Sequence, residues 1–159
     1  MKTQIIFRVL LIFLLLLYTK LIYSQIIYVK HDAIGINDGT SWQNAFTDLQ
    51  DALTISTDND MIWIAAGIYH PGGQSPDSSS IFAVHKSIFI YGGFNGTEIS
   101  LEERDPVVNV TILSGDINED DILDDFTSNK SDNTRHVIYV DSLLDLAIMD
   151  GFTFQGGHT

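Results

Sequence analysis

Short apolar runs that end at a glycine recur along this chain, and their spacing limits the folds that the chain can adopt. The clearest runs cover residues 61–66 before Gly67, 88–91 before Gly92, 111–114 before Gly115 and 147–150 before Gly151. These glycines are 25, 23 and 36 residues apart. The third interval equals the period plus about 13 residues, the size of a polar, acid-rich insertion that starts near Ile117. Such a period predicts a solenoid, in which each unit buries its apolar face against the next.

A small antiparallel sandwich is the alternative fold. Its glycine turns would come roughly every 8 to 12 residues, about half the main intervals found here. Further apolar runs at 81–84, 107–110 and 136–140 lie between the glycine-terminated ones. They fit several strands per coil of a solenoid, and they also fit hairpins, so the periodicity favours the solenoid without excluding the sandwich.

Local sequence patterns predict two further strands and one helix. Residues 26–29 form a β-branched and aromatic run, and Phe152 and Phe154 alternate with polar residues before a Gly-Gly turn, so a strand is expected in each place. Thr40 and Ser41 are good N-cap residues. After them, apolar residues follow at steps of three and four: Trp42, Ala45, Phe46, Leu49, Ala52 and Leu53. This pattern predicts an amphipathic helix over 42–53.

The first 24 residues are typical of a secretory signal peptide. Lys2 and Arg8 precede an apolar run at 9–18, and Ser24 offers a small residue for cleavage before Gln25. A transmembrane anchor is the alternative, but it needs roughly 20 apolar residues, whereas Lys20 follows closely after this run. We therefore expect export and a mature chain of residues 25–159.

The charge of the chain excludes one class of partner. The full sequence has a net charge of -13, and the signal peptide carries three bases and no acids, which leaves -16 for residues 25–159. Nucleic-acid binding depends on Lys and Arg displacing counterions, so nucleic acid is not expected as a partner. The chain has no Cys, so neither a lipid anchor nor a disulfide framework can form.

Several motifs, in order, resemble exported bacterial right-handed parallel β-helix proteins of the pectin-lyase-like superfamily, including their polymorphic outer-membrane members. The opening of the family is matched by GTSWQNAF at 39–46, LQDAL at 49–53 and DMIWIAAGIY at 60–69. Successive coils are matched by IYGGF at 90–94, ERD at 103–105, TILSGD at 111–116 and DGFTFQGG at 150–157. The resemblance covers about residues 27–157.

This resemblance implies an all-β fold, a right-handed parallel β-helix with an N-terminal amphipathic capping helix. The cap would shield the backbone groups of the first coil from aggregation. Family members continue for many more coils, so residues 25–159 are expected to be the cap and roughly four first coils of a stack, truncated at the C-terminus. The alternative is that the uncovered last coil pairs with another chain.

Two functions follow from the resemblance, because one scaffold hosts both. The first is a structural or adhesin-like role at the bacterial cell surface or outer membrane, or as a secreted protein, without catalysis of its own. Its partners would be a surface polysaccharide, another protein or a second copy. The alternative is the N-terminal part of a pectate-lyase-like carbohydrate-active enzyme whose catalytic coils lie beyond residue 159.

One acidic stretch is a candidate calcium site. Asp116, Asn118 and Asp120 have the alternating oxygen spacing of a calcium loop. However, Asp121 replaces the glycine of the sharp turn, and Thr127 stands where the bidentate acid is expected. A solvated acidic insertion is therefore the alternative, and no other cofactor is expected.

No catalytic or ligand-binding residue can be assigned from the sequence. The histidines have no ligand spacing: they are His31, His70, His85, His136 and His158. The bases Lys86, Lys130 and Arg135 match no lyase motif, and Arg104, in the ERD turn, is expected to form a structural ion pair. The apolar context of the large aromatic residues indicates core positions rather than a sugar-stacking platform. These residues are Tyr28, Trp42, Trp63, Tyr69 and Tyr91.

Overall fold

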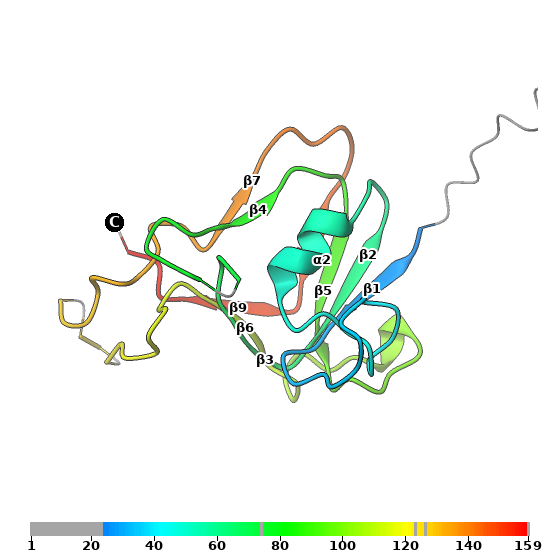
Figure 1. Cartoon of the computed structure of the whole chain (residues 1–159), viewed down its shortest axis with the longest axis horizontal. Helices are drawn as coiled ribbons and strands as arrows, with labels where there is room; N and C mark the ends of the chain where they lie inside the picture. Colours follow the sequence, from blue (N-terminus) through cyan, green and yellow to red (C-terminus); the bar gives the residue numbers. More distant parts are fainter. Residues whose placement is uncertain (1–23, 74, 123, 126, 159) are drawn as a thin grey trace, which may run out of the picture.

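The computed structural model describes residues 24–73, 75–122, 124–125 and 127–158. The signal peptide predicted at 1–24 lies outside the described residues, except for Ser24. Strands dominate the regular structure (Figure 1). In the described part of the chain, none of the helices has the length and apolar character needed to cross a bilayer.

In the part of the chain that the structure describes, nine short strands form three sheets. The first sheet has the order β1 (Ile26–Val29), β2 (Met61–Ala65), β5 (Phe89–Phe94) and β8 (Ile148–Asp150). The second has the order β3 (Gly67–Tyr69), β6 (Thr111–Ser114) and β9 (Phe152–Gln155), and the third pairs β4 (Phe82–Val84) with β7 (Ile138–Val140).

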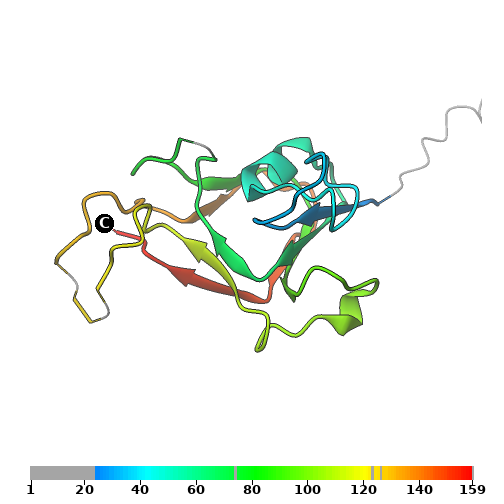
Figure 2. The same cartoon turned by 60° about the horizontal axis from the view of Figure 1, so that its bottom comes forward.

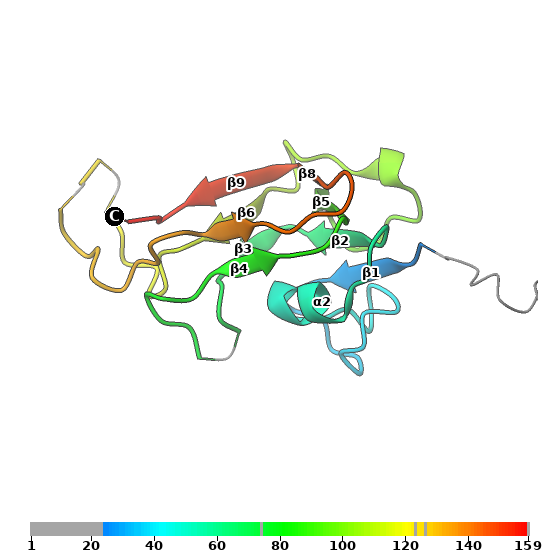
Figure 3. The same ribbon diagram turned by 90° about the horizontal axis from the view of Figure 1, so that it is seen from above.

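All the strand pairs in these sheets are parallel. Successive strands β2, β3 and β4 belong to three different sheets, and β5, β6 and β7 pair with them one layer further on. The chain therefore winds in stacked coils, as in a β-solenoid, and Figure 3 shows β1, β2, β5 and β8 one above another. This topology excludes the antiparallel sandwich.

The period predicted from the glycines is wrong in one respect. The runs at 61–66, 88–91 and 147–150 do form successive layers of the first sheet, but the run at 111–114 forms β6 in the second sheet. The layers of the first sheet start at Met61, Phe89 and Ile148, so the coils differ in length. The difference arises because the connections at 95–110 and 115–137 are long, and their described parts project from the stack (Figure 2).

Two of the three additional apolar runs form strands, and one does not. The run at 81–84 contains β4 and the run at 136–140 contains β7, as predicted. The run at 107–110 lies in a turn, where Val107 and Val108 are 87% and 74% exposed. The Asp105 carboxylate accepts hydrogen bonds from the N–H groups of both valines, which holds this segment as a turn.

The core lies between the three sheets. Side chains alternate along each strand, so that Ile62, Ile64 and Ile90 point inward together with Leu113 and Phe82. Burying each such side chain contributes about 1.5–3 kcal/mol. This shared interior, extended by each coil, holds the stack together.

The helix is shorter than predicted and begins later. Helix α2 (Leu49–Ile55) has Asp48 as its N-cap, and the Asp48 carboxylate accepts a hydrogen bond from Gln50 N–H at 2.7 Å. The predicted caps Thr40 and Ser41 precede a series of turns instead. The reason is that Phe46 bonds to the first strand, donating to Tyr28 O and accepting from Lys30 N, which excludes a helical backbone there.

Helix α2 nevertheless lies at the end of the stack, where a cap was expected. It packs against β1 and β4, with Leu49, Ala52 and Leu53 buried in the core (Figures 1 and 3). A short 3₁₀ helix, η1 (Leu101–Glu103), lies in the connection between β5 and β6.

Candidate functional site

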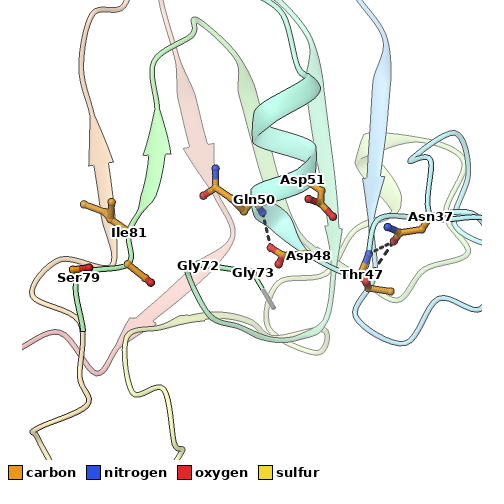
Figure 4. Close-up of a pocket in the computed structure, with 10 residues that line it drawn as sticks. Asn37, Thr47, Asp48, Gln50, Asp51, Gly72, Gly73, Ser79 and Ile81 are labelled. Atoms are coloured by element: carbon orange, nitrogen blue, oxygen red, sulfur yellow. Dashed lines mark hydrogen bonds between the residues drawn. The ribbon is translucent and has the colours of Figure 1, made fainter. Parts of the chain in front are cut away.

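A polar pocket of about 670 Å³ lies between the start of α2 and the connection from β3 to β4 (Figure 4). Its polar side chains already bond to neighbouring backbone groups: Asn37 Oδ1 accepts from Thr47 N–H at 2.8 Å, and Asp48 caps the helix. Burial raises the pKa of Asp48. Asn37 and Asp48 therefore hold together the turns that border the pocket.

A second cluster, on the outer face of the first sheet, consists of aromatic rings. Tyr28, Trp63 and Tyr91 occupy equivalent positions in β1, β2 and β5. The Trp63 and Phe94 rings stack at 4.7 Å, and the Trp42 ring lies 4.8 Å from Tyr28. Trp42 Nε1 donates to Glu98 O at 2.9 Å, so the connection from β5 to β6 lies over these rings.

The core positions predicted for the five aromatic residues are confirmed for two of them. Trp63 and Tyr69 are buried, whereas Tyr28, Trp42 and Tyr91 are half-buried. The rings face one another rather than forming an open platform. Phe46 is also buried, and neither Trp42 nor Phe46 points into water.

Arg104 forms the structural ion pair that its sequence context predicts. Its guanidinium pairs with Asp150, donates to Gly92 O at 3.2 Å and lies 5.2 Å from the centre of the Tyr91 ring. Arg104 therefore ties the connection after β5 to β8. Lys86 has a comparable structural role, because its ammonium donates to Leu53 O and Thr54 O at the end of α2.

Two of the histidines, His70 and His85, lie in local contacts with carboxylates. His70 Nε2 lies 3.1 Å from Glu119 Oε1, and His85 pairs with Asp141 beyond the ends of β4 and β7. The bond from His85 lowers the pKa of Asp141. Among the described residues, these pairs have no neighbouring hydroxyl group bonded to the imidazole, so a hydrolytic triad is not assembled.

Three carboxylates do converge at the start of the connection from β6 to β7. Asp116, Asp120 and Asp121 can place one oxygen each within 4.8 Å of the others, so this cluster could hold a metal ion. Asp116 is 5% exposed, and its two oxygens accept from Asp120 N–H at 3.2 Å and Asp121 N–H at 3.0 Å. Lys130 Nζ lies 2.7 Å from Asp121 Oδ1.

The cluster includes two of the three residues in the predicted calcium set. Asp116 and Asp120 come together, and Asp121 joins them. The backbone N–H of Asn118 donates to Asp132 Oδ2 at 2.9 Å. Asp121 was missed because a calcium loop requires a glycine at that position, whereas here the backbone turns back onto Asp116 and brings Asp121 to it.

The coil opposite α2 is the other prominent feature. Leu144 and Leu146, in the connection from β7 to β8, are exposed, and Val140 of β7 and Phe154 of β9 are about half exposed. Within the described residues, the outer edges of β7, β8 and β9 have no neighbouring strand. This end, defined by Val140, Leu144, Leu146 and Phe154 with the three free edges, is called the open end below.

Comparison of the chain with protein-family models, with curated proteins and with solved structures found no match. The parallel, three-sheet architecture is therefore described from the strand pairing. The relation to pectin-lyase-like proteins stays a prediction from the motifs.

Proposed function

We propose that this chain is part of an exported right-handed β-solenoid with a structural, adhesin-like role, and that its open end is a contact surface for protein. It has no catalysis of its own in this proposal. The exposure of interior side chains at the open end supports it. The motifs resembling secreted and outer-membrane β-helix proteins support export and location at the cell surface.

Side chains at interior positions are much more exposed in the last coil than at the equivalent positions of the preceding coils. Tyr69, Leu113 and Phe154 are partners in one column across β3, β6 and β9, and they are 3%, 0% and 49% exposed. Val84 and Val140 are partners in β4 and β7, and their exposures are 3% and 48%. Side chains that are buried in one coil are therefore open to water in the next, where another layer would cover them.

The strand edges at the open end favour a partner that contributes strands. Unpaired N–H and C=O groups along an edge are a template for pairing with another chain. A second copy of this chain presents the same edges and the same apolar side chains, so two copies can join in an isologous contact. We therefore expect the chain to self-associate through the open end.

Analytical ultracentrifugation of the exported protein over a range of concentrations tests this function. The expected result is a dimer whose fraction rises with concentration and falls in Phe154→Asp. Val107→Asp is the matched control, because Val107 is 87% exposed in the connection from β5 to β6. A monomer at every concentration, or equal weakening by both variants, would contradict the proposal.

Export has a separate test. If residues 1–24 form a signal peptide, the secreted protein begins at Gln25. Intact-mass spectrometry of the exported material measures this directly. Retention of residues 1–24 would favour the membrane anchor instead.

A further inference from the structure

A buried carboxylate lies directly before β2. It belongs to Asp60, which is 1% exposed. The ion pairs in the described part of the chain do not include Asp60. Burying an ionised carboxylate is costly unless the group is paired and hydrogen-bonded. The donors that reach Asp60, and the charge that they carry, therefore decide what this residue does for the fold.

Within the described residues, three hydrogen bonds reach the Asp60 carboxylate. Thr57 donates twice to Oδ2, from its N–H at 2.7 Å and from its hydroxyl at 2.9 Å. The N–H of Gln25 donates to Oδ1 at 3.0 Å. Thr57 is three residues from Asp60, whereas Gln25 is 35 residues away, at the start of the first layer. The contact with Gln25 therefore depends on the stacking of the first two layers.

The pairing of β1 with β2 places Gln25 next to Asp60. Ile26 is the partner of Met61 in this register, so Gln25 stands opposite Asp60 one position earlier. Met61 N–H donates to Gln25 O at 2.9 Å, and Phe89 N–H of the third layer donates to Asp60 O at 2.9 Å. Backbone hydrogen bonds between the layers therefore hold the Gln25 nitrogen and the Asp60 carboxylate in position.

Gln25 is also the residue that would begin the mature chain if the signal peptide is cleaved after Ser24. In the uncleaved chain, the Gln25 nitrogen is a neutral peptide N–H. After cleavage, the same nitrogen is an α-ammonium group at neutral pH, because an α-amino group has a pKa of about 7.7–8.0. Ser24 and Gln25 are both exposed, so the ammonium hydrogens that do not point at Asp60 can bond to water.

We propose that cleavage after Ser24 creates an ion pair between the α-ammonium of Gln25 and the buried carboxylate of Asp60, and that this ion pair stabilises the mature fold. The neutral N–H of the uncleaved chain already bonds to Asp60 Oδ1, and the ammonium adds the opposite charge that this carboxylate otherwise lacks. The inference rests on the export part of the proposed function, and it does not involve the open end.

The ion pair also has a chemical consequence for the new terminus. The neutral α-amine of an N-terminal glutamine can attack its own side-chain amide. A bond then forms between the amine nitrogen and Cδ, and the amide nitrogen leaves with the amine proton as ammonia, which yields an uncharged five-membered lactam. An opposite charge at hydrogen-bonding distance favours the protonated form of an amine, which has no free electron pair for this attack. Asp60 should therefore protect Gln25 from cyclisation.

Intact-mass spectrometry of the exported protein tests this protection. The wild type should begin at Gln25 and keep its free amine during storage at pH 7. The Asp60→Asn variant, which removes the charge, should lose one ammonia about tenfold faster or more. In Gln25→Ala the terminus cannot cyclise, so this variant is the control for ammonia lost elsewhere in the chain.

A second variant leaves Asp60 unchanged, because Asp60→Asn also alters the bonds from Thr57. One alanine inserted between Ser24 and Gln25 moves the ammonium one residue away, while Gln25 keeps a neutral N–H beside Asp60. The insertion should lower the melting temperature of the exported protein by about 4 °C or more. Gln25→Ala keeps the ammonium in place and should melt as the wild type does. In the Asp60→Asn background, the insertion should have no further effect.

The outcomes separate this inference from the proposed function. Retention of residues 1–24 in the exported protein would overturn both export and the ion pair. A mature chain that begins at Gln25 but cyclises as fast as Asp60→Asn would overturn the ion pair alone. An equal melting temperature with and without the inserted alanine would do the same. A failure to dimerise through the open end would leave the ion pair standing.

Discussion

At the scale of single residues, Glu98 shows how this acidic chain buries a carboxylate. Glu98 is 6% exposed, and its oxygens accept hydrogen bonds from the N–H groups of Asn95, Gly96 and Thr97 at 2.6, 3.0 and 3.0 Å. Burial raises the pKa of Glu98, but the backbone N–H groups of residues 95–98 lower it by more. The ionised carboxylate therefore holds the turn whose backbone accepts from Trp42.

Glu98→Gln should destabilise the fold by about 1–3 kcal/mol at pH 7, because the amide offers one acceptor atom instead of two. The folded pKa is lowered, so the stability from the charge is present above the unfolded pKa of about 4.3 and is lost as the pH falls through the folded pKa. Urea unfolding should show that the wild type and the variant differ at pH 7 and converge at acidic pH.

Glu102→Gln is the control for this prediction, because Glu102 is exposed on η1. It should change the free energy of unfolding by less than about 0.5 kcal/mol. An equal loss in both variants, or a constant difference across the pH series, would show that the charge of Glu98 does not hold the turn.

A second feature at this scale is the close approach of two glycines from neighbouring layers. Gly151 has a φ of +85°, and a Cβ built on it would lie 2.7 Å from Gly92 O and 2.8 Å from Arg104 Nη1. The glycines thus leave space for the Arg104 guanidinium to reach Gly92 O and Asp150 between β5 and β8.

At the scale of elements, each strand is too short to be stable alone and depends on the layers above and below it. Strand β6 has only four residues, and it pairs with β3 on one side and β9 on the other. Its inward side chains, Thr111 and Leu113, are buried, whereas Ile112 points outward and is half-buried. The inward-facing side chains of β6 therefore account for most of the stability that this strand gives to the fold.

Leu113→Ala should destabilise the protein by about 2–5 kcal/mol, because it leaves a cavity between Tyr69 and Phe154. Ile112→Ala, on the other face of the same strand, should cost clearly less. Chemical denaturation of both variants measures the difference. Similar losses at the two positions would mean that the interior of the stack is not packed as described.

At the scale of the whole molecule, two forces act on the open end in opposite directions. The apolar side chains at this end favour contact between copies, whereas the net charge of -16 on residues 25–159 makes the copies repel each other. Repulsion between exposed charges is screened over about 10 Å at 0.1 M salt and about 3 Å at 1 M salt. Burial of apolar surface is not weakened by salt.

Self-association should therefore become stronger as the salt concentration rises. The measurement is the dimer fraction in ultracentrifugation at low and high NaCl, with Phe154→Asp for comparison. If the dimer instead dissociates in high salt, charged contacts rather than the apolar open end hold the two copies together.

The strands were the most predictable part of this structure. The runs at 26–29, 81–84 and 111–114 and the alternating Phe152 and Phe154 all form strands, because β-branched and aromatic residues between turn signals favour an extended backbone locally. The stacking of coils was inferred from the glycine spacing, although that spacing mixed two sheets, and the parallel arrangement was inferred from the motif resemblance. Of the candidate metal site, Asp116 and Asp120 were found from their spacing.

Long-range contacts decided the remaining features. The apolar spacing over 42–53 is helical, but hydrogen bonds from Phe46 to Tyr28 and Lys30 turn the first half into a loop. Asp121 and Asn133 meet only because the connection after β6 returns to the stack. The amino-acid sequence by itself determined where strands form, since this depends on local side-chain sterics. Tertiary structure alone decided which strands stack, where the helix begins and which carboxylates converge, because hydrogen bonds and charges act between residues that are distant in sequence.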